Sequence, residues 1–249
     1  MARLTGKFAL ITGGSSGIGL ETARQFIAEG ATVAITGRDA AALARARAEL
    51  GPDVITLTSD AGDIAGQAVL AQEINRLWGR LDILFVNAGD VTHLPLAEWR
   101  EASYQQVMHT NFSGPFFLIQ NLLPLFRRPA SIILCGSTSV HIGLPQSSVY
   151  AASKAALLSL ARTLSGELIG QGIRVNGLSP GPTDTPAMKK LGLPAEEEAL
   201  LRKTIVELVP AGELGSPADI AYAAVYLASD ESRFMVGTEM LVDGGVANL

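Results

Sequence analysis

The stretch that decides the fold is Phe8-Ala-Leu-Ile-Thr12, followed by Gly13-Gly-Ser-Ser-Gly17-Ile-Gly19. A short apolar, β-prone run breaks into glycines and serines, and Leu20 to Glu29 then shows helical spacing. The pattern predicts a strand, a glycine turn and a helix. Glycines in such a turn let backbone amides approach a pyrophosphate, which the helix N-terminus favours electrostatically. The spacing G-x-x-x-G-x-G differs from the usual dinucleotide motif, so a plain strand-to-helix turn stays open as the alternative.

Strand and helix patterns alternate along the rest of the chain. Further strands are predicted at 32–36, 54–58, 81–86, 131–135, 173–178 and 238–242, and helices at 40–50, 64–78, 99–126, 146–169 and 216–229. Successive βα units imply a parallel sheet with helices on both faces. We therefore predict an α/β fold, a doubly wound Rossmann-type parallel sheet of about seven strands, in a single domain over residues 1–249.

Composition narrows the classes of partner. Of the 249 residues 48% are apolar, which is ample for a core, and the net charge of -5 offers no basic field for nucleic acid or anionic lipid. The chain has no signal-peptide pattern, and its single cysteine, Cys135, cannot form an internal disulfide. We expect a cytoplasmic protein that binds neither nucleic acid nor membrane. His93, His109 and His141 lack metal-ligand spacing, so no metal is expected.

The end of the second predicted strand bears on the choice of cofactor. In a parallel sheet of this kind ligands bind beyond the carboxyl ends of the strands, where an acid suits the ribose diol of NAD and an arginine the 2′-phosphate of NADP. Gly37 leaves the acid position empty and Arg38 follows it. Asp39 is more simply the N-cap of the helix that starts at Ala40. We predict NADP(H) as the cofactor, with NAD(H) as the alternative.

The run Tyr150-Ala-Ala-Ser-Lys154 places a phenol and an ammonium four residues apart in a helix-forming segment. Both side chains must project from the same face of that helix. A lysine about 4 Å from the phenol favours the phenolate by roughly 4 kcal/mol at the effective dielectric of a protein site. Such a pair can make a tyrosine an acid that works near neutral pH. Taken alone, the pair fits an ordinary surface helix equally well.

The predicted helix 99–126 contains a proline, Pro115, in its interior. Because proline has no amide hydrogen, the carbonyl of Asn111 loses its helical donor, and a kink is expected there. The freed carbonyl could accept a hydrogen bond from an ordered water near an active site. A tolerated kink in a buried helix is the simpler alternative.

Two later segments suggest a partner and a lid. The predicted helix 146–169 carries small or apolar residues around most of its circumference, so the sheet can cover only one side. A second copy of the chain, related by twofold symmetry, is our candidate for the other side. We therefore expect a homo-oligomer, a tetramer or a dimer. The segment at about 186–210 interrupts the βα rhythm at a strand's carboxyl end and is predicted to be a substrate lid.

Several motifs occur in an order and spacing that are specific in combination. They are Thr12-Gly-Gly-Ser-Ser-Gly-Ile-Gly19, Asp60, Asn87-Ala-Gly89, Asn111, Ser137, Tyr150-x-x-x-Lys154 and Pro180-Gly181. In these motifs, and from Lys7 to Gly245, the chain closely resembles the short-chain dehydrogenase/reductase family in its single-domain form. The resemblance implies an oxidoreductase that transfers a hydride between a nicotinamide and a carbonyl or secondary alcohol.

The resemblance also implies a catalytic tetrad. Tyr150 would be the general acid in carbonyl reduction and the base in alcohol oxidation. Lys154 would favour the phenolate and hold the nicotinamide ribose. Ser137 would hydrogen-bond the substrate oxygen, and Asn111 would hold a water that relays protons to Lys154.

Cofactor contacts are implied at the same strand ends. The implied cofactor residues are Gly13, Ser15, Ser16, Gly17, Ile18, Gly19, Arg38, Asp60, Ala61, Asn87, Ala88, Gly89, Tyr150, Lys154, Pro180, Gly181, Thr183 and Thr185. Ser137, Ser139, His141, Leu144 and Met188 are predicted to line the substrate pocket.

The leading hypothesis is an NADP(H)-dependent carbonyl reductase that runs in reverse as an alcohol dehydrogenase. A 3-oxoacyl-carrier-protein reductase is the nearby alternative, and it would need a basic patch for an acidic carrier. Arg127 and Arg128 could contribute to such a patch, although two arginines that end a helix are more simply partners of its dipole. A non-catalytic dinucleotide-binding sensor is the alternative from another class, but it would not need Ser137 and Tyr150 together.

Overall fold

The computed structural model describes residues 2–186 and 194–249. Its centre is a seven-stranded parallel sheet with the strand order β3-β2-β1-β4-β5-β6-β7. The strands are β1 (Phe8–Ile11), β2 (Thr32–Gly37), β3 (Ile55–Thr58), β4 (Leu81–Val86), β5 (Phe126–Cys135), β6 (Ile173–Pro180) and β7 (Glu239–Val242). The predicted α/β, Rossmann-type sheet is therefore confirmed.

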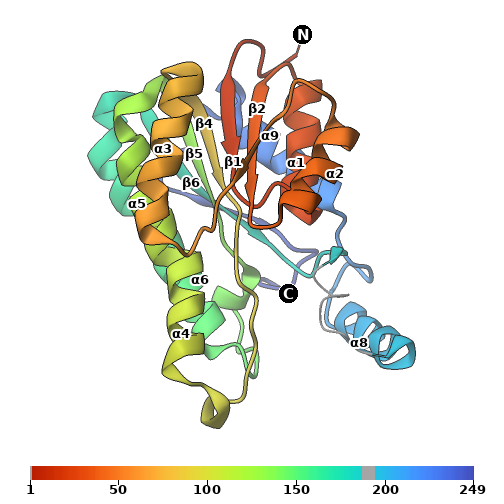
Figure 1. Cartoon of the computed structure of the whole chain (residues 1–249). Helices are drawn as coiled ribbons and strands as arrows, with labels where there is room; N and C mark the ends of the chain where they lie inside the picture. The colour runs from red at the N-terminus through yellow and green to blue at the C-terminus, as the bar shows by residue number, and fades with distance from the viewer. Residues whose placement is uncertain (1, 187–193) are drawn as a thin grey trace.

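Helices cover both faces of the sheet (Figure 1). The helices that pack on one face are α3 (Ile64–Trp78), α5 (Gly114–Leu122) and α6 (Ser148–Leu168), with α4 (Glu101–Met108) packed against α6. The helices on the other face are α1 (Gly17–Ala28), α2 (Ala40–Leu50) and α9 (Pro217–Ala228). Each face has its own apolar core, because the strands are buried on both sides.

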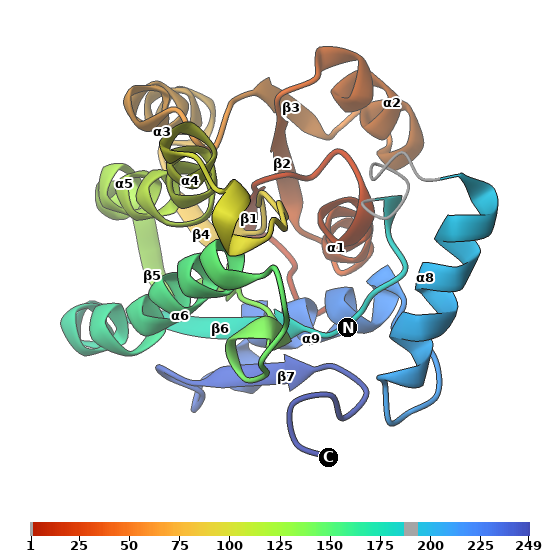
Figure 2. The same ribbon diagram turned by 90° about the horizontal axis from the view of Figure 1, so that it is seen from below.

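The strand order reverses between β1 and β4, which are neighbours in the sheet although two βα units separate them in sequence. Figure 2 shows the molecule from below, where α1 follows β1 close to this point. In open parallel sheets the crevice for a ligand lies beyond the carboxyl ends of the strands at such a reversal. The glycine turn after β1 and the Asn87 segment after β4 both lie there.

The prediction of a single long helix at 99–126 is wrong. The chain forms α4, then a π-helical turn at His109–Ser113, then α5, and it enters β5 at Phe126. In the π turn the amide of Gly114 donates to the carbonyl of His109, which widens the helix just before Pro115. Proline cannot donate in the helical pattern, so the irregularity falls where a kink is expected.

Arg127 and Arg128 are therefore strand residues, and their interpretation as the end of a helix is corrected. Both are exposed at the amino end of β5, whose opposite end is Cys135. The apolar residues around Phe126 fit a helix and a strand equally well, and pairing with β4 and β6 decides between them.

The described part of the predicted lid forms α8 (Ala195–Glu207), which has no buried residue. Figure 1 shows α8 apart from the helical layers, beyond the carboxyl ends of the strands. Two hydrogen bonds between Arg202 and Asp184, at 2.8 and 2.7 Å, link α8 to the loop that follows β6. In the described ranges, no helix is long and apolar enough to cross a bilayer.

Gly114 provides a test of how tightly the π turn packs. A Cβ atom at this position would overlap the carbonyl oxygen of Ala61, in the loop after β3. We expect Gly114→Ala to lower the free energy of unfolding by about 1–3 kcal/mol, because the backbone has to move. Chemical denaturation measures the change.

Gly166→Ala is the matched control, since Gly166 also lies in a helix but an added Cβ meets nothing within 4 Å. This variant should be neutral or more stable by up to about 1 kcal/mol. Equal stability of the two variants would contradict the packing argument.

Candidate active site

The glycine turn is fastened to the end of β4 by a few polar contacts. The Thr12 hydroxyl accepts from the amides of Asn87 and Ala88, at 2.9 and 3.0 Å. The Asn87 side-chain amide donates to the carbonyls of Thr12 and Gly13, at 3.0 and 3.2 Å. Two segments predicted to bind one cofactor are thus held together directly.

The glycines of this turn are required by close approach. An added Cβ at Gly13 would lie 2.9 Å from the Cα of Ala88, and one at Gly14 would lie 2.6 Å from Ile35. Gly13 and Gly17 also have positive φ, at 67° and 55°. The turn leads into the N-terminus of α1, where Ser16 is the N-cap residue and makes no side-chain cap bond. This backbone suits a pyrophosphate, because free amides and the helix dipole point at the same place.

The ends of β2 and β3 carry the residues predicted to bind the adenosine part. Arg38 is exposed and forms no ion pair with any residue that the structure describes. Asp39 is the N-cap of α2 and accepts from the amides of Ala41 and Ala42, so its simpler interpretation is confirmed. Asp60 accepts from the amide of Gly62 at 2.9 Å, which shapes the loop.

Tyr150 and Lys154 lie on α6, with the Lys154 Nζ 5.9 Å from the centre of the Tyr150 ring. Lys154 is only 3% exposed, and its Nζ donates to the carbonyl of Cys135 at 2.7 Å. That carbonyl ends β5, two residues before Ser137. An added Cβ at Gly89 would lie 3.4 Å from this Nζ, so the end of β4 is also close. The helix thus brings the pair to the carboxyl ends of β4 and β5.

Ser137 starts a short 3-10 turn at Thr138–Val140. Its hydroxyl accepts from the amide of Ser139 at 3.2 Å. Ser139 is buried, and its own hydroxyl has no hydrogen-bond partner among the described residues. A buried hydroxyl without a partner is costly, so Ser139 has an unused hydrogen-bonding group beside the predicted catalytic serine.

Asn111 is fully buried, and its side chain holds neighbouring segments together. Its amide nitrogen donates to the Asp90 carbonyl and to the Ser153 hydroxyl, both at 2.9 Å, and its oxygen accepts from the Asp90 amide at 2.7 Å. Asn111 therefore ties the loop after β4 to α6, one residue before Lys154. The water site at its main-chain carbonyl stays a prediction.

The loop after β6 passes over the glycine turn. An added Cβ at Gly17 would lie 3.4 Å from the side chain of Thr185. The Thr183 hydroxyl donates to the carbonyl of Gly181 at 2.9 Å, and Thr183 pairs with Gly215. The structure therefore brings Thr185, predicted to contact the nicotinamide, next to the glycine turn, predicted to hold the pyrophosphate.

The predicted substrate residues are only partly together. Ser139 follows Ser137 directly, and the exposed residues His141 and Leu144 come next in the same loop. His141 already has a partner, Glu239 of β7, with 2.9 Å between Nε2 and Oε1. Met188 lies outside the described residues.

Sequence reasoning missed a residue that touches the candidate catalytic tyrosine. The rings of His93 and Tyr150 lie 5.2 Å apart at 58°, although the two residues are far apart in sequence. His93 is exposed by surface area, yet the protein around it desolvates the imidazole and lowers its pKa. A hydrogen bond from the Leu94 amide to the Gln146 carbonyl, at 3.0 Å, holds the loop. Periodicity does not reveal such a contact, because His93 lies in an irregular segment.

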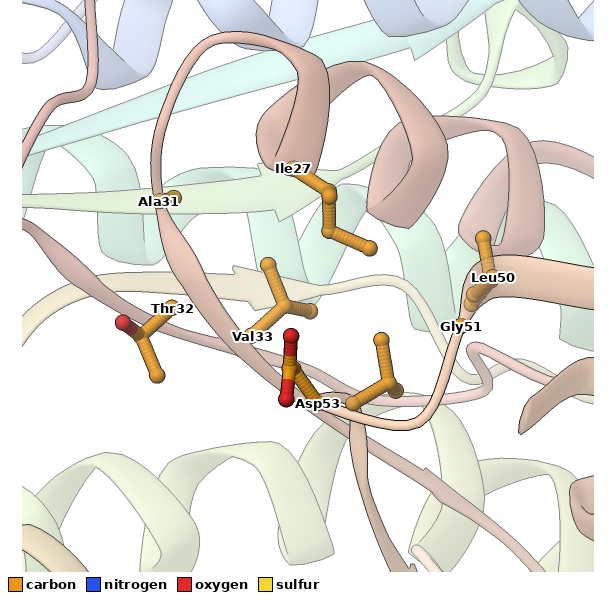
Figure 3. Close-up of a pocket in the computed structure, with 8 residues that line it drawn as sticks. Ile27, Ala31, Thr32, Val33, Leu50, Gly51 and Asp53 are labelled. Atoms are coloured by element: carbon orange, nitrogen blue, oxygen red, sulfur yellow. The ribbon is translucent and has the colours of Figure 1, made fainter.

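A separate cavity of about 330 Å³ lies at the other end of the sheet (Figure 3). It is lined by Ile27, Ala31, Thr32, Val33, Leu50, Gly51, Asp53 and Val54. It contains none of the predicted site residues and lies apart from the candidate site. The described residues contain no group of three or more His, Cys, Asp or Glu placed to hold a metal ion.

Known proteins share this architecture and much of this sequence. A family model described as enoyl-(acyl carrier protein) reductase matches residues 13–247. The chain is 40% identical to oxidoreductase asL5 of Sarocladium schorii, over 99% of this chain and 98% of the relative. It is 36% identical to the NADP-dependent (R)-specific alcohol dehydrogenase of Lentilactobacillus kefiri, over 98% and 97%.

A solved structure, the Pseudomonas aeruginosa RhlG/NADP active-site complex, superposes with a TM-score of 0.91. The two sequences are 34% identical, and the match covers 98% of this chain and 97% of that one. Family model, relatives and fold agree over nearly the whole chain. The chain therefore belongs to the short-chain dehydrogenase/reductase family of oxidoreductases, which bind a nicotinamide dinucleotide.

Proposed function

We propose that this chain is an NADP(H)-dependent carbonyl reductase that also runs in reverse as an alcohol dehydrogenase. The observation that carries the proposal is the meeting of Tyr150, Lys154 and the Ser137 turn at the carboxyl ends of β4 and β5. The NADP-dependent alcohol dehydrogenase among the relatives supports the reaction and the cofactor.

The nicotinamide, when bound, supplies or accepts the hydride. In the reducing direction the Tyr150 phenol donates a proton to the substrate oxygen, and the phenolate takes the proton back during oxidation. The Ser137 hydroxyl donates a hydrogen bond to the same oxygen and stabilises the negative charge that develops there. Lys154, held by the Cys135 carbonyl, stabilises the phenolate by its positive charge.

Protons from solvent pass through a water held by the main-chain carbonyl of Asn111 to Lys154, and from Lys154 to Tyr150. This relay is supported by the position of Asn111, whose side-chain amide bonds to both Asp90 and Ser153 and so lies beside Lys154 in the fold. Asp60 and Ala61 contact the adenine, Asn87 to Gly89 the adenosine ribose side, and Thr183 with Thr185 the carboxamide of the nicotinamide. Ser139, with its unpartnered hydroxyl, contacts the substrate.

We assign the NADP(H) preference to Arg38. Its guanidinium is exposed at the end of β2 and is not engaged by any described carboxylate, which leaves it free for a 2′-phosphate. Asp39 does not compete for a ribose diol, because its carboxylate caps α2. NAD(H) remains the alternative cofactor.

Assembly into a homo-oligomer, a tetramer or a dimer, accompanies this function. Exposed positions of α6 carry small residues, among them Ala152, Ala155 and Ser159. Such a face lets another helix approach closely. The buried free thiol of Cys135, whose pKa is raised by burial, fits the reducing cytoplasm that we propose as the compartment.

Other activities have less support. A 3-oxoacyl-carrier-protein reductase needs a basic surface near the site, but Arg127 and Arg128 lie at the amino end of β5, away from Ser137. A non-catalytic sensor would not need Tyr150, Lys154 and Ser137 to converge. The convergence of these residues therefore favours carbonyl reduction over a sensor, and the position of Arg127 and Arg128 favours a free small-molecule carbonyl over one bound to a carrier protein.

Replacing the Tyr150 phenol tests the mechanism. We expect Tyr150→Phe to reduce turnover of carbonyl substrates by at least about 100-fold, because the proton donor is lost. NADPH binding, followed by nicotinamide fluorescence, should stay within about twofold of wild type, since the ring is kept. Tyr104→Phe, at an exposed tyrosine of α4, is the control and should keep full activity. Unchanged turnover in Tyr150→Phe would refute the mechanism.

Replacing Arg38 tests the cofactor preference. Arg38→Ala should raise KM for NADPH by about 10- to 100-fold, because a charged hydrogen bond to the 2′-phosphate is lost. KM for NADH should change little. Arg45→Ala, at an exposed arginine of α2, is the control. Equal rises for both cofactors in Arg38→Ala would contradict the assignment.

The pH dependence of stability tests the environment of His93. Burial lowers the pKa of this imidazole from its ordinary value of 6.5, so the unfolded chain takes up the proton at a higher pH than the folded chain does. His93 therefore contributes stability that is present above pH 6.5 and is lost as the pH falls through the folded-state pKa. We expect His93→Phe to lose less stability than wild type on going from about pH 7 to about pH 5, measured by chemical denaturation. Parallel losses would show that desolvation of His93 is unimportant.

A further inference from the structure

The turn that carries Ser137 is anchored firmly at its start. The Gly136 amide donates to the carbonyl of Leu178 at 2.8 Å, and the Thr138 hydroxyl donates to the carbonyl of Pro180 at 3.3 Å. Both partners belong to β6. These contacts fix the first half of the turn. The far end of the turn, at His141, has a different anchor.

The far end is held by a carboxylate of the edge strand. His141 Nε2 lies 2.9 Å from Oε1 of Glu239 on β7, and the same oxygen accepts from the Ser179 hydroxyl at 2.5 Å. His141 and Glu239 keep 34% and 24% of their side chains exposed, so the pair is only partly screened by water. One carboxylate oxygen therefore joins β6, β7 and the end of the Ser137 turn.

The buried member of this set also touches the start of the turn. Ser179 is fully buried, and an added Cβ at Gly136 would collide with its hydroxyl oxygen. Glu239 thus holds Ser179 against Gly136 at one end and His141 at the other. A shift of Glu239 would therefore move both ends of the turn that positions the Ser137 hydroxyl.

We propose that Glu239 is a positioning residue for Ser137, and that it acts through His141 and Ser179 to hold the turn in place. The inference rests on the proposed function, in which the Ser137 hydroxyl donates to the substrate oxygen. In this role His141 supports the site through Glu239 instead of contacting the substrate. The geometry requires a hydrogen on Nε2, because the carboxylate can only accept.

Steady-state kinetics test the effect on catalysis. Glu239→Ala should lower kcat for carbonyl reduction by roughly 10- to 100-fold, because small displacements of a catalytic group are costly. The dissociation constant for NADPH should stay unchanged. Glu239→Gln keeps a side-chain oxygen that can accept both bonds and should recover most of the activity. Asp53→Ala, which removes an exposed carboxylate at the far end of the sheet, is the control.

A double-mutant cycle tests whether the effect passes through His141. We expect His141→Ala combined with Glu239→Ala to be no worse than Glu239→Ala alone, because both variants break the same bond. Wild-type kcat in Glu239→Ala, or additive losses in the double variant, would overturn the proposal.

Hydrogen exchange tests the turn itself without substrate. The amides of Ser139, Val140 and His141 donate within the turn, to Ser137 Oγ, the Ser137 carbonyl and the Thr138 carbonyl. They should exchange faster in Glu239→Ala than in wild type, while amides of the core strands are unaffected. A lower kcat with unchanged exchange would mean that Glu239 does not act through the turn, and the inference would fall. Faster exchange in a chain that reduces no carbonyl would leave the support role standing and remove the proposed function.

Discussion

Burial of one ammonium group is the constraint on which the candidate site depends. A buried charge has to be compensated by neighbouring polar atoms, and Lys154 meets the carbonyl that ends β5. This contact holds α6 against the carboxyl end of the sheet. The segment Asn87-Ala-Gly89, which follows β4, lies at the same end. An ammonium has three donors, so a single carbonyl leaves capacity for ligands. The position of Tyr150, four residues earlier on the same helix, follows from that of Lys154.

Most of the sheet could be predicted from the sequence because each βα unit contains its own local signals. The helices at 40–50 and 64–78 and the strand at 81–86 have the predicted bounds, since Asp39 and Asp63 cap the helices and the strand is apolar at every position except Asp82. The glycine turn could also be located, because only glycine tolerates its backbone geometry and contacts.

The rest depends on contacts between distant segments. The apolar residues around Phe126 give no local sign of strand or helix, so the start of β5 at Phe126 was not predicted. The ring contact of His93 with Tyr150 and the bonds of Asn111 to Asp90 and Ser153 join loops whose path no sequence pattern specifies. Glu239 looked like an ordinary residue of an edge strand, and its partners come from two other elements.

Arg38 differs from the other predicted site residues in having no structural task. Thr12 and Asn87 hold loops, and Lys154 holds a helix, so changes there disturb the fold. Arg38 extends from the end of β2 without an ion pair among the described residues, and α2 is capped by its neighbour Asp39. Evolution or an engineer can therefore exchange the residue at position 38 almost independently of the catalytic machinery. Under the proposed assignment, the choice between NADP(H) and NAD(H) can therefore change without a change in the catalytic residues or in the fold.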